Sequence, residues 1–255
     1  MTAANDDDRH RLAASFDSAA DLYERVRPGY AAAAVDWALG SRARSVLDLA
    51  AGTGKLTAAL VGRGIDVIAI DPSPAMLAQL TARLPGVDAR LGTAEAIDLP
   101  DASVDVVTVA SALHWFDRPA ADFEMARVLR AGGTVAVFRN RRDPDLDWVR
   151  RFDAIMRDVP QDVLRLRREG TPPRLDASVF GPFTERAFGF RQTLDADRLV
   201  ELAASRSYVI TMAEPDRSRL LDRIRELALT HPDLAGRSEF ELPYSTVVSR
   251  AARKG

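Results

Sequence analysis

Apolar residues follow two rhythms along the 255-residue chain, and the rhythm changes near residue 40. After a polar tail of about ten residues, they recur every three or four positions from Arg11 to Leu39, the spacing of one helix face. Arg27 to Tyr30 interrupts this pattern with Pro and Gly, and a second helix is expected from Ala31 to Leu39, ending at Gly40. Residues 1–40 are therefore predicted to form a helical cap.

Beyond residue 40, short apolar runs alternate with stretches of helical pattern. The runs are almost continuously apolar, which is typical of strands buried on both faces of a parallel sheet. Gly132 and Gly133 are expected to separate the last of these helices from its strand. The alternation predicts an α/β fold with a mostly parallel sheet. The expected strands are 45–49, 66–70, 105–109 and 134–138, and the expected helices are 55–63, 74–84 and 119–130.

The regular alternation lapses after Arg139. Residues 140–182 are rich in Arg, Asp and Pro and are interpreted as an insertion, with a helix near Trp148 to Met156. Later segments predict a strand at 183–190, helices at 195–205 and 217–230, and a last strand within 240–251. We expect a single domain over 1–255, divided into a cap (1–40), a cofactor-binding core (41–139), the insertion (140–182), and remaining elements (183–255) with a second insertion near 206–238.

The composition is ordinary for a globular protein, with 47% hydrophobic and 28% charged residues and a net charge of -2. The chain has no cysteine and only three histidines, so no metal site and no thiolate chemistry are expected. No apolar run approaches the roughly 20 residues of a membrane span, and the acidic N-terminus has no signal-peptide pattern. These observations predict a cytoplasmic protein that binds neither membranes nor nucleic acids; the oligomeric state stays open.

The stretch from Val46 to Thr57 carries the most specific chemistry. It places Gly52 and Gly54 in a turn between a buried strand and a helix, where small residues allow a ligand to approach the backbone. Asp71 ends the next strand, 17 residues after Gly54, at the position from which a carboxylate accepts hydrogen bonds from a ribose diol.

Two kinds of cofactor compete for such a turn. A dinucleotide requires a third glycine where this chain has Thr57, and Asp48 would place a carboxylate beside its pyrophosphate. The same carboxylate is favourable beside the ammonium and sulfonium groups of S-adenosylmethionine, so charge favours that cofactor. An NAD-dependent oxidoreductase and a non-catalytic S-adenosylmethionine-binding protein stay as alternatives.

Five stretches, in order, resemble the motifs of class I S-adenosylmethionine-dependent methyltransferases. The departure is Ala50, where the family usually has glycine. The resemblance implies a doubly wound, Rossmann-like, mostly parallel seven-stranded sheet with an N-terminal helical cap and an antiparallel last strand. The stretches are Val46 to Thr57, Ile70 to Leu77, Gly92 to Pro100, Ser103 to Phe116, and Arg127 to Gly133.

Three further segments are similar to a narrower subgroup, the type 11 or trans-aconitate methyltransferase-like enzymes. They are Arg27 to Tyr30, His114 to Phe116, and Phe240 to Tyr244.

The resemblance also implies a set of site residues. Asp71 would hold the ribose, Ala94 and Glu95 would lie beside the adenine within reach of Met76, and Arg27 would pair with the cofactor carboxylate. Ordinary roles compete with these: packing for Met76, a helix cap for Asp71, and a surface ion pair for Arg27. The expected cofactor-binding residues are Asp48, Ala50, Gly52, Gly54, Asp71, Pro72, Met76, Ala94, Glu95, Ala110 and Arg27.

His114 is the candidate catalytic base, with Trp115 and Phe116 as an apolar wall that excludes water; pocket lining and core packing are the alternatives. The expected reaction is methyl transfer to an oxygen or nitrogen atom of a small molecule. An ionised carboxylate is one candidate acceptor, and it would need no base.

A run of arginines after the strand expected at 134–138 bears on the acceptor. It either recognises a carboxylate or forms solvated helix faces balanced by nearby aspartates, and the second reading is favoured. Nucleic acid is a poor acceptor candidate, because Ala110 to His114 stands where nucleobase methyltransferases carry Asn/Asp-Pro-Pro-Tyr/Phe. The arginines are Arg139, Arg141, Arg142, Arg150 and Arg151.

Overall fold

The computed structural model describes residues 20–160, 163 and 173–255, which fall into two compact units. Unit 1 comprises the described parts of 1–28, 142–170 and 190–244. Unit 2 comprises the described parts of 29–141, 171–189 and 245–255. The expected single domain over 1–255 stays a prediction, and the expected helical pattern over 11–19 lies outside the described residues.

Unit 2 contains a parallel sheet whose strand order reverses in the middle. The order in the seven-stranded sheet is β3-β2-β1-β4-β5-β7-β6, and the neighbours from β3 to β5 pair in parallel. The chain therefore builds outward from β1 to β3 and then returns to the other side of β1, which confirms the predicted doubly wound fold. The parallel strands are β1 (Ser45–Leu49), β2 (Asp66–Asp71), β3 (Asp88–Leu91), β4 (Val104–Ala110) and β5 (Leu129–Arg142).

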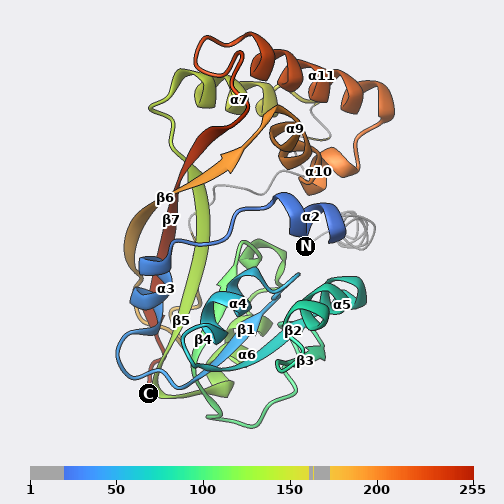
Figure 1. Cartoon of the computed structure of the whole chain (residues 1–255). Coiled ribbons are helices and arrows are strands. Elements are labelled where there is room, and N and C mark those ends of the chain that lie inside the picture. The colour runs from blue at the N-terminus through green and yellow to red at the C-terminus, as the bar shows by residue number, and fades with distance from the viewer. Residues whose placement is uncertain (1–19, 161–162, 164–172) are drawn as a thin grey trace. The chain divides into compact units, whose positions relative to one another are not determined.

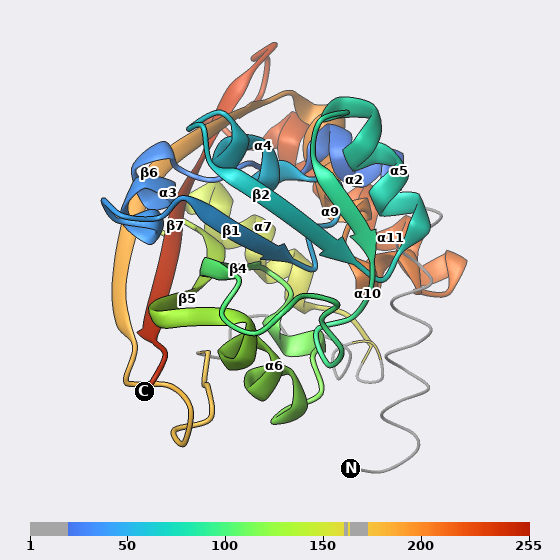
Figure 2. The ribbon, with the colours of Figure 1, turned by 90° about the horizontal axis from the view of Figure 1, so that it is seen from below.

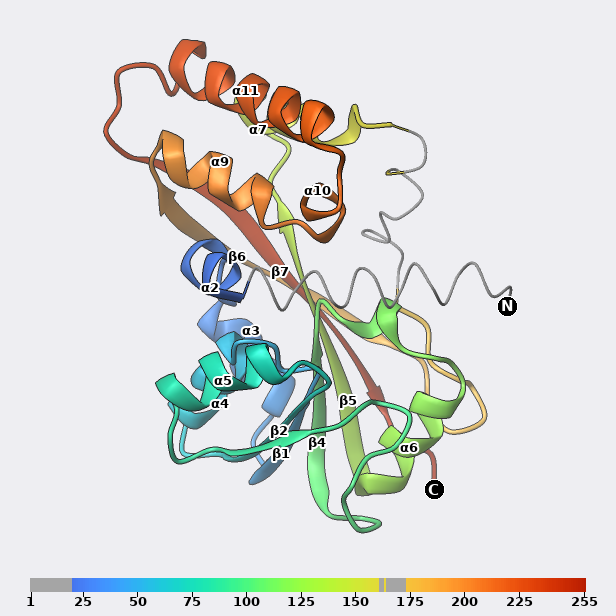
Figure 3. The same cartoon turned by 90° about the vertical axis from the view of Figure 1, so that its right-hand side faces the viewer.

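Helices cover both faces of these parallel strands. Helices α4 (Lys55–Val61) and α5 (Pro74–Arg83) lie on one face, and α6 (Ala120–Val128) lies on the other (Figures 2 and 3). Residues of β1 and β4 and the inner face of α6 share one buried hydrophobic core. This burial on both sides explains why the strands are continuously apolar. Helix α3 (Ala32–Leu39) ends at Gly40, as predicted, with a left-handed φ of 62°.

The last strand runs antiparallel to its neighbour, as the resemblance implies. Strand β7 (Phe240–Ala252) is next to β5, with the backbone N–H of Asp143 donating to Pro243 and that of Arg253 donating to Gly133. Low residue numbers on one strand thus meet high numbers on the other. Strand β6 (Thr184–Leu194) forms the far edge of the sheet beyond β7.

Unit 1 is mainly helical around the ends of three strands (Figure 1). Its core packs Trp148, Phe152, Leu199 and Ile224, which come from three helices. The predicted helices near 148–156, 195–205 and 217–230 are confirmed, with α11 beginning earlier because Pro215 suits a first helical turn. The helices are α2 (Ala20–Val26), α7 (Asp147–Arg157), α9 (Ala196–Ala204), α10 (Ser207–Ile210) and α11 (Glu214–Thr230).

One expectation about the sheet is wrong. Gly132 and Gly133 lie inside β5 and do not separate it from α6, because the strand already begins at Leu129. Val104 pairs with Leu129 and Val106 with Thr134, so β5 carries extra residues there as a bulge. Gly132 takes a φ of 76° in this bulge, which suits glycine.

Candidate functional site

The predicted cofactor residues of unit 2 gather at the carboxyl ends of three neighbouring strands. Asp48 and the glycine turn come from β1, Asp71 and Pro72 from β2, and Ala110 from β4. Because β2, β1 and β4 are adjacent and parallel, these ends meet at one edge of the sheet, where the strand order reverses. Ligands of doubly wound sheets bind at this kind of edge.

The backbone is strained at two of these strand ends. Ala50, after β1, has a φ of 56°, and Ser111, after β4, has a φ of 57°. A left-handed conformation costs a non-glycine residue about 1–2 kcal/mol. Strain of this kind collects at functional sites, so the two outliers point to the same edge of the sheet as the motifs do.

The two glycines of the turn serve different purposes. A Cβ on Gly54 would lie 2.8 Å from Cγ of Leu80, so this glycine lets the turn pack against α5. A Cβ on Gly52 would meet no atom of the described residues within 4 Å. Gly52 therefore presents its backbone to open space, as a residue against which a ligand packs must do.

Asp71 fixes the position of the glycine turn. Its side chain is buried, and Oδ2 accepts a hydrogen bond of 2.7 Å from the backbone N–H of Gly52. Oδ1 accepts one of 2.9 Å from the N–H of Ser73. Ser73 itself caps α5 by accepting from the N–H of Met76. A carboxylate oxygen can accept more than one hydrogen bond, so Asp71 keeps capacity for a ribose diol.

Asp48 is fully buried between two threonines. Oδ2 accepts from the hydroxyl of Thr57 at 2.6 Å, and Oδ1 accepts from that of Thr108 at 2.9 Å. Burial raises the pKa of Asp48 to about 6, against the opposing effect of these two hydrogen bonds. The sequence interpretation treated Thr57 only as a missing glycine. Thr108, the second partner of Asp48, could have been found as the one threonine inside the apolar run of β4.

Thr53 is a further residue that the sequence analysis missed. It lies between the two glycines with only 1% of its surface exposed, and its hydroxyl has no hydrogen-bond partner among the described residues. A buried hydroxyl without a partner is costly, and a ligand at the glycine turn can supply one.

The segment predicted to lie beside the adenine is tied to other elements by hydrogen bonds. Ala94 is buried, and Oε1 of Glu95 accepts from the backbone N–H of Asp117 at 2.7 Å. Met76 is buried at the start of α5, whereas Pro72 is exposed. Their contacts with a cofactor stay predictions.

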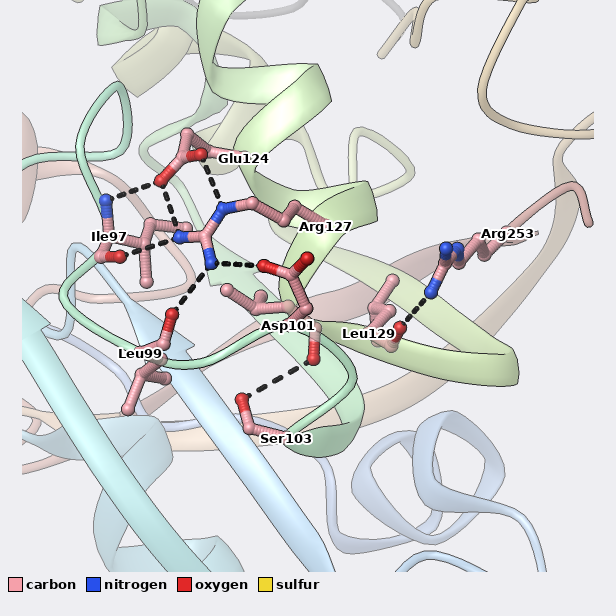
Figure 4. Close-up of polar contacts among 9 residues, drawn as sticks. Ile97, Leu99, Asp101, Ser103, Glu124, Arg127, Leu129 and Arg253 are labelled. Carbon is pink, nitrogen blue, oxygen red and sulfur yellow. Dashed lines mark hydrogen bonds and ion pairs between the residues drawn. The ribbon is translucent and has the colours of Figure 1, made fainter.

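A cluster around Arg127 of α6 holds the end of this segment (Figure 4). The guanidinium of Arg127 donates to the carbonyl oxygens of Ile97 and Leu99, both at 2.7 Å. It also pairs with Glu124 at 2.7 Å and Asp101 at 2.9 Å. Glu124 in turn accepts from the backbone N–H of Ile97 at 2.8 Å. Arg127 and its four partners, the Arg127 cluster, therefore fix residues 97–101 against α6.

His114 and Trp115 belong to the short helix η1 (Leu113–Trp115), directly after β4. Their ring centroids are 4.8 Å apart, and both side chains are half-buried. Phe116 is buried in the core of unit 2. The position of His114 at the same edge as the glycine turn suits a base, and this role stays a prediction.

Arg27 belongs to unit 1, whereas the other predicted cofactor residues belong to unit 2. Its guanidinium donates to the carbonyl oxygen of Ser205 at 3.0 Å and lies 4.9 Å from the ring centroid of Tyr23. Of the arginines predicted to follow the strand at 134–138, Arg139, Arg141 and Arg142 lie inside β5, because this strand extends to Arg142. Arg150 and Arg151 both pair with Asp147 and are exposed, as solvated helix faces are.

The residues present fit S-adenosylmethionine. Gly52 leaves its face of the turn open, Thr53 holds there a hydroxyl with no partner among the residues that the structure describes, and Asp71 ends the neighbouring strand. Asp48 places negative charge behind the turn, which suits a cationic cofactor.

Comparison with known proteins shows the family of the chain. Residues 47–137 match the family model described as a methyltransferase domain. An uncharacterised methyltransferase of Mycobacterium tuberculosis is 47% identical over 246 residues, covering 95% of this chain and 97% of that protein. An uncharacterised methyltransferase-like protein of Schizosaccharomyces pombe is 32% identical over 234 residues, covering 88% and 90%. A solved structure from Anaeromyxobacter dehalogenans, described as a type II methyltransferase, is 27% identical with a TM-score of 0.64, covering 89% and 97%.

The chain belongs to the class I S-adenosylmethionine-dependent methyltransferases. It is therefore an enzyme whose cofactor is S-adenosylmethionine, and the oxidoreductase and the non-catalytic binding protein are set aside. No helix in the described part of the chain is both long and apolar enough to cross a bilayer.

Proposed function

We propose that the enzyme transfers a methyl group from S-adenosylmethionine to an oxygen or nitrogen atom of a small molecule. The observation that carries the cofactor assignment is the bond from Gly52 N–H to Asp71, which holds the open face of the turn beside a ribose-binding carboxylate. The acceptor class is supported by the residues after β4. Ala110 to His114 replaces the motif with which nucleobase methyltransferases hold their base.

Each residue has a distinct task in this proposal. Asp71 accepts from the ribose hydroxyls, Thr53 bonds the cofactor at the turn, and Asp48 stabilises positive charge. When bound, S-adenosylmethionine supplies an electrophilic methyl group on a sulfonium. The chain aligns the nucleophile with that methyl group and excludes water. His114 accepts a proton where the nucleophile carries one, whereas a carboxylate acceptor needs no base.

Calorimetric titration with S-adenosylmethionine, S-adenosylhomocysteine and NAD tests the cofactor site. We expect the first two to bind and NAD not to bind. Asp71→Asn should weaken binding at least tenfold, because it removes a charge-assisted acceptor for the ribose. Asp66→Asn is the matched control, since Asp66 is exposed at the opposite end of the same strand. Tighter binding of NAD, or equal losses in the two variants, would contradict the proposal.

The role of His114 is tested by the pH profile of turnover with an acceptor found by screening small carboxylic acids, phenols and amines. If His114 is the base, His114→Gln lowers kcat at least 100-fold and removes the acidic limb of the profile, with the KM for S-adenosylmethionine unchanged. If kcat for an acceptor with a protonated nucleophile falls similarly but the pH profile of turnover does not change, His114 lines the pocket and is not the base.

A further inference from the structure

A polar cluster in unit 1 is not used by the methyltransferase site described above. It centres on Tyr244, the last residue of the β7 segment that belongs to this unit. Its side chain is 3% exposed, and its hydroxyl has no hydrogen-bond partner among the described residues. An isolated buried hydroxyl is uncommon in folded proteins and calls for an explanation.

The strand register places Arg142 beside this tyrosine. The backbone N–H of Asp143, the residue directly after β5, donates to Pro243 of β7, so these two residues lie opposite each other. The adjacent pair, Arg142 and Tyr244, therefore also lies opposite, with both side chains on one face of the sheet. On the other side of β7, Phe190 of β6 stacks on Tyr244, with ring centroids 5.2 Å apart and planes 13° apart.

Two further arginines come from the helices of unit 1. Arg27 follows α2 and donates to the carbonyl oxygen of Ser205, which brings it next to Arg206 at the start of α10. Gln192 of β6 donates to the carbonyl oxygen of Val26 at 2.8 Å, which brings the end of α2 to the strand that carries Phe190. Burial raises the pKa of the Tyr244 hydroxyl, and the positive charges of Arg142, Arg206 and Arg27 oppose this shift because they favour the ionised form.

Arg142 is held in place before any ligand arrives. Its guanidinium pairs with Asp153, and it lies 4.9 Å from the ring centroid of Phe152. Only 8% of its side chain is exposed. A fixed guanidinium loses little conformational entropy on binding, which is why arginine is suited to recognising carboxylates.

We propose that Tyr244, Arg142, Arg206 and Arg27 form a binding site for the carboxylate of a small organic molecule. The ligand oxygens would accept from the Tyr244 hydroxyl and from guanidinium N–H groups, so that the buried hydroxyl gains the partner it lacks among the described residues. Two sources can supply this group, the methyl acceptor and the methionine part of the cofactor. The proposal of a carboxylate site is argued from these contacts alone. Its assignment to the methyl acceptor also rests on the proposed function.

The decisive variant is Tyr244→Phe, because it removes the hydroxyl and keeps the ring that stacks on Phe190. Loss of a hydroxyl with no partner in the described part of the chain should leave the melting temperature unchanged or higher. Tyr208→Phe is the matched control. Tyr208 is equally buried in unit 1, but its hydroxyl donates to the carbonyl oxygen of Met156 at 3.4 Å. This control should lose some stability and keep its ligand affinity.

Binding is measured by calorimetry with succinate, with S-adenosylmethionine, and with decarboxylated S-adenosylmethionine, at constant ionic strength. If the acceptor supplies the carboxylate, Tyr244→Phe weakens succinate binding about tenfold, and Arg206→Gln weakens it similarly. If the cofactor supplies the carboxylate, Tyr244→Phe and Arg206→Gln each weaken the binding of S-adenosylmethionine about tenfold. The affinity for decarboxylated S-adenosylmethionine then stays unchanged. Tyr208→Phe changes neither.

Equal affinities of the wild-type protein and both variants for succinate and for S-adenosylmethionine would overturn the proposal. So would equal losses in Tyr244→Phe and Tyr208→Phe. Failure of the proposed function is visible separately, as the absence of S-adenosylmethionine binding to the wild-type protein while its affinity for succinate still depends on Tyr244.

Discussion

Ala50 shows how a single methyl group can oppose the local backbone. It has a φ of 56° in the turn after β1, where the family usually has glycine. We predict that Ala50→Gly raises the free energy of unfolding by about 0.5–1 kcal/mol. Relief of left-handed strain exceeds the entropy that glycine adds to the unfolded chain. Urea denaturation at pH 7.5 measures the change.

Ala78→Gly is the control for this prediction. Ala78 is exposed inside α5, so glycine there should lower the free energy of unfolding by about 1 kcal/mol. Destabilisation by both substitutions would mean that the methyl group of Ala50 packs favourably enough to outweigh its strain.

Asp48 gives a pH dependence of known sign. Its pKa is about 6 in the folded protein and close to the ordinary 3.8 when unfolded, so the folded state binds the proton more tightly. The stabilisation is complete below about pH 3.8 and is lost as the pH rises through 6; it amounts to roughly 3 kcal/mol. Asp48→Asn should remove this dependence. Urea midpoints of both proteins between pH 4 and 8 test it, and parallel profiles would show that Asp48 does not titrate in this range.

Among the elements, the loop between β3 and β4 depends on one side chain of a neighbouring helix. The guanidinium of Arg127 reaches the carbonyl oxygens of Ile97 and Leu99 at the same time as its acidic partners. Lysine keeps the charge but has no planar fork. We predict that Arg127→Lys speeds hydrogen exchange across residues 92–103 and weakens S-adenosylmethionine about fivefold, because Ala94 and Glu95 are then less well positioned.

Arg130→Lys is the matched control for the Arg127 cluster. Arg130 lies three residues further along, and its partners are Asp105 and Ser45. Exchange in 92–103 should therefore stay as in the wild-type protein. Equal acceleration in both variants would indicate a general loosening of the unit.

Continuous apolar runs made β1, β2 and β4 predictable, because a strand buried on both faces is apolar throughout and each run is too short for a buried helix. The short strand β3 was missed, since its four residues are half-buried or exposed and two of them are charged. The start of β5 was predicted too late, because paired glycines are typical of a turn. Only pairing with β4 shows that the strand continues through them.

The glycine turn and Asp71 could be predicted because their chemistry is local to one strand–turn–helix unit. The partners of Asp48 and Arg127 could not be predicted. Thr108 reaches Asp48, and the carbonyl oxygens of Ile97 and Leu99 reach Arg127, only through tertiary packing.

 
The row of Arg142, Tyr244 and Phe190 needed the register of three strands, which residue spacing alone does not give.

At the scale of the whole molecule, the two units share their strands. The boundaries at 141/142, 189/190 and 244/245 fall inside β5, β6 and β7, so neither unit is a continuous piece of chain. Strands β5 and β7 belong to both units and carry hydrogen bonds in each, from Asp143 to Pro243 in unit 1 and from Arg253 to Gly133 in unit 2. Because each unit is made of several separate segments of the chain, we expect the two units to unfold together, as a single domain over 1–255 would.

We therefore predict one cooperative unfolding transition, which the three tryptophans can report. Trp148 belongs to unit 1, and Trp37 and Trp115 belong to unit 2. A Trp37→Phe, Trp115→Phe variant leaves the probe in unit 1, and a Trp115→Phe, Trp148→Phe variant leaves one in unit 2. In each variant the fluorescence and far-UV circular dichroism transitions in urea should coincide, since both follow the same two-state process. A fluorescence midpoint that precedes the circular dichroism midpoint in one variant would show that its unit unfolds independently, and residues 1–255 would then have to be treated as two domains.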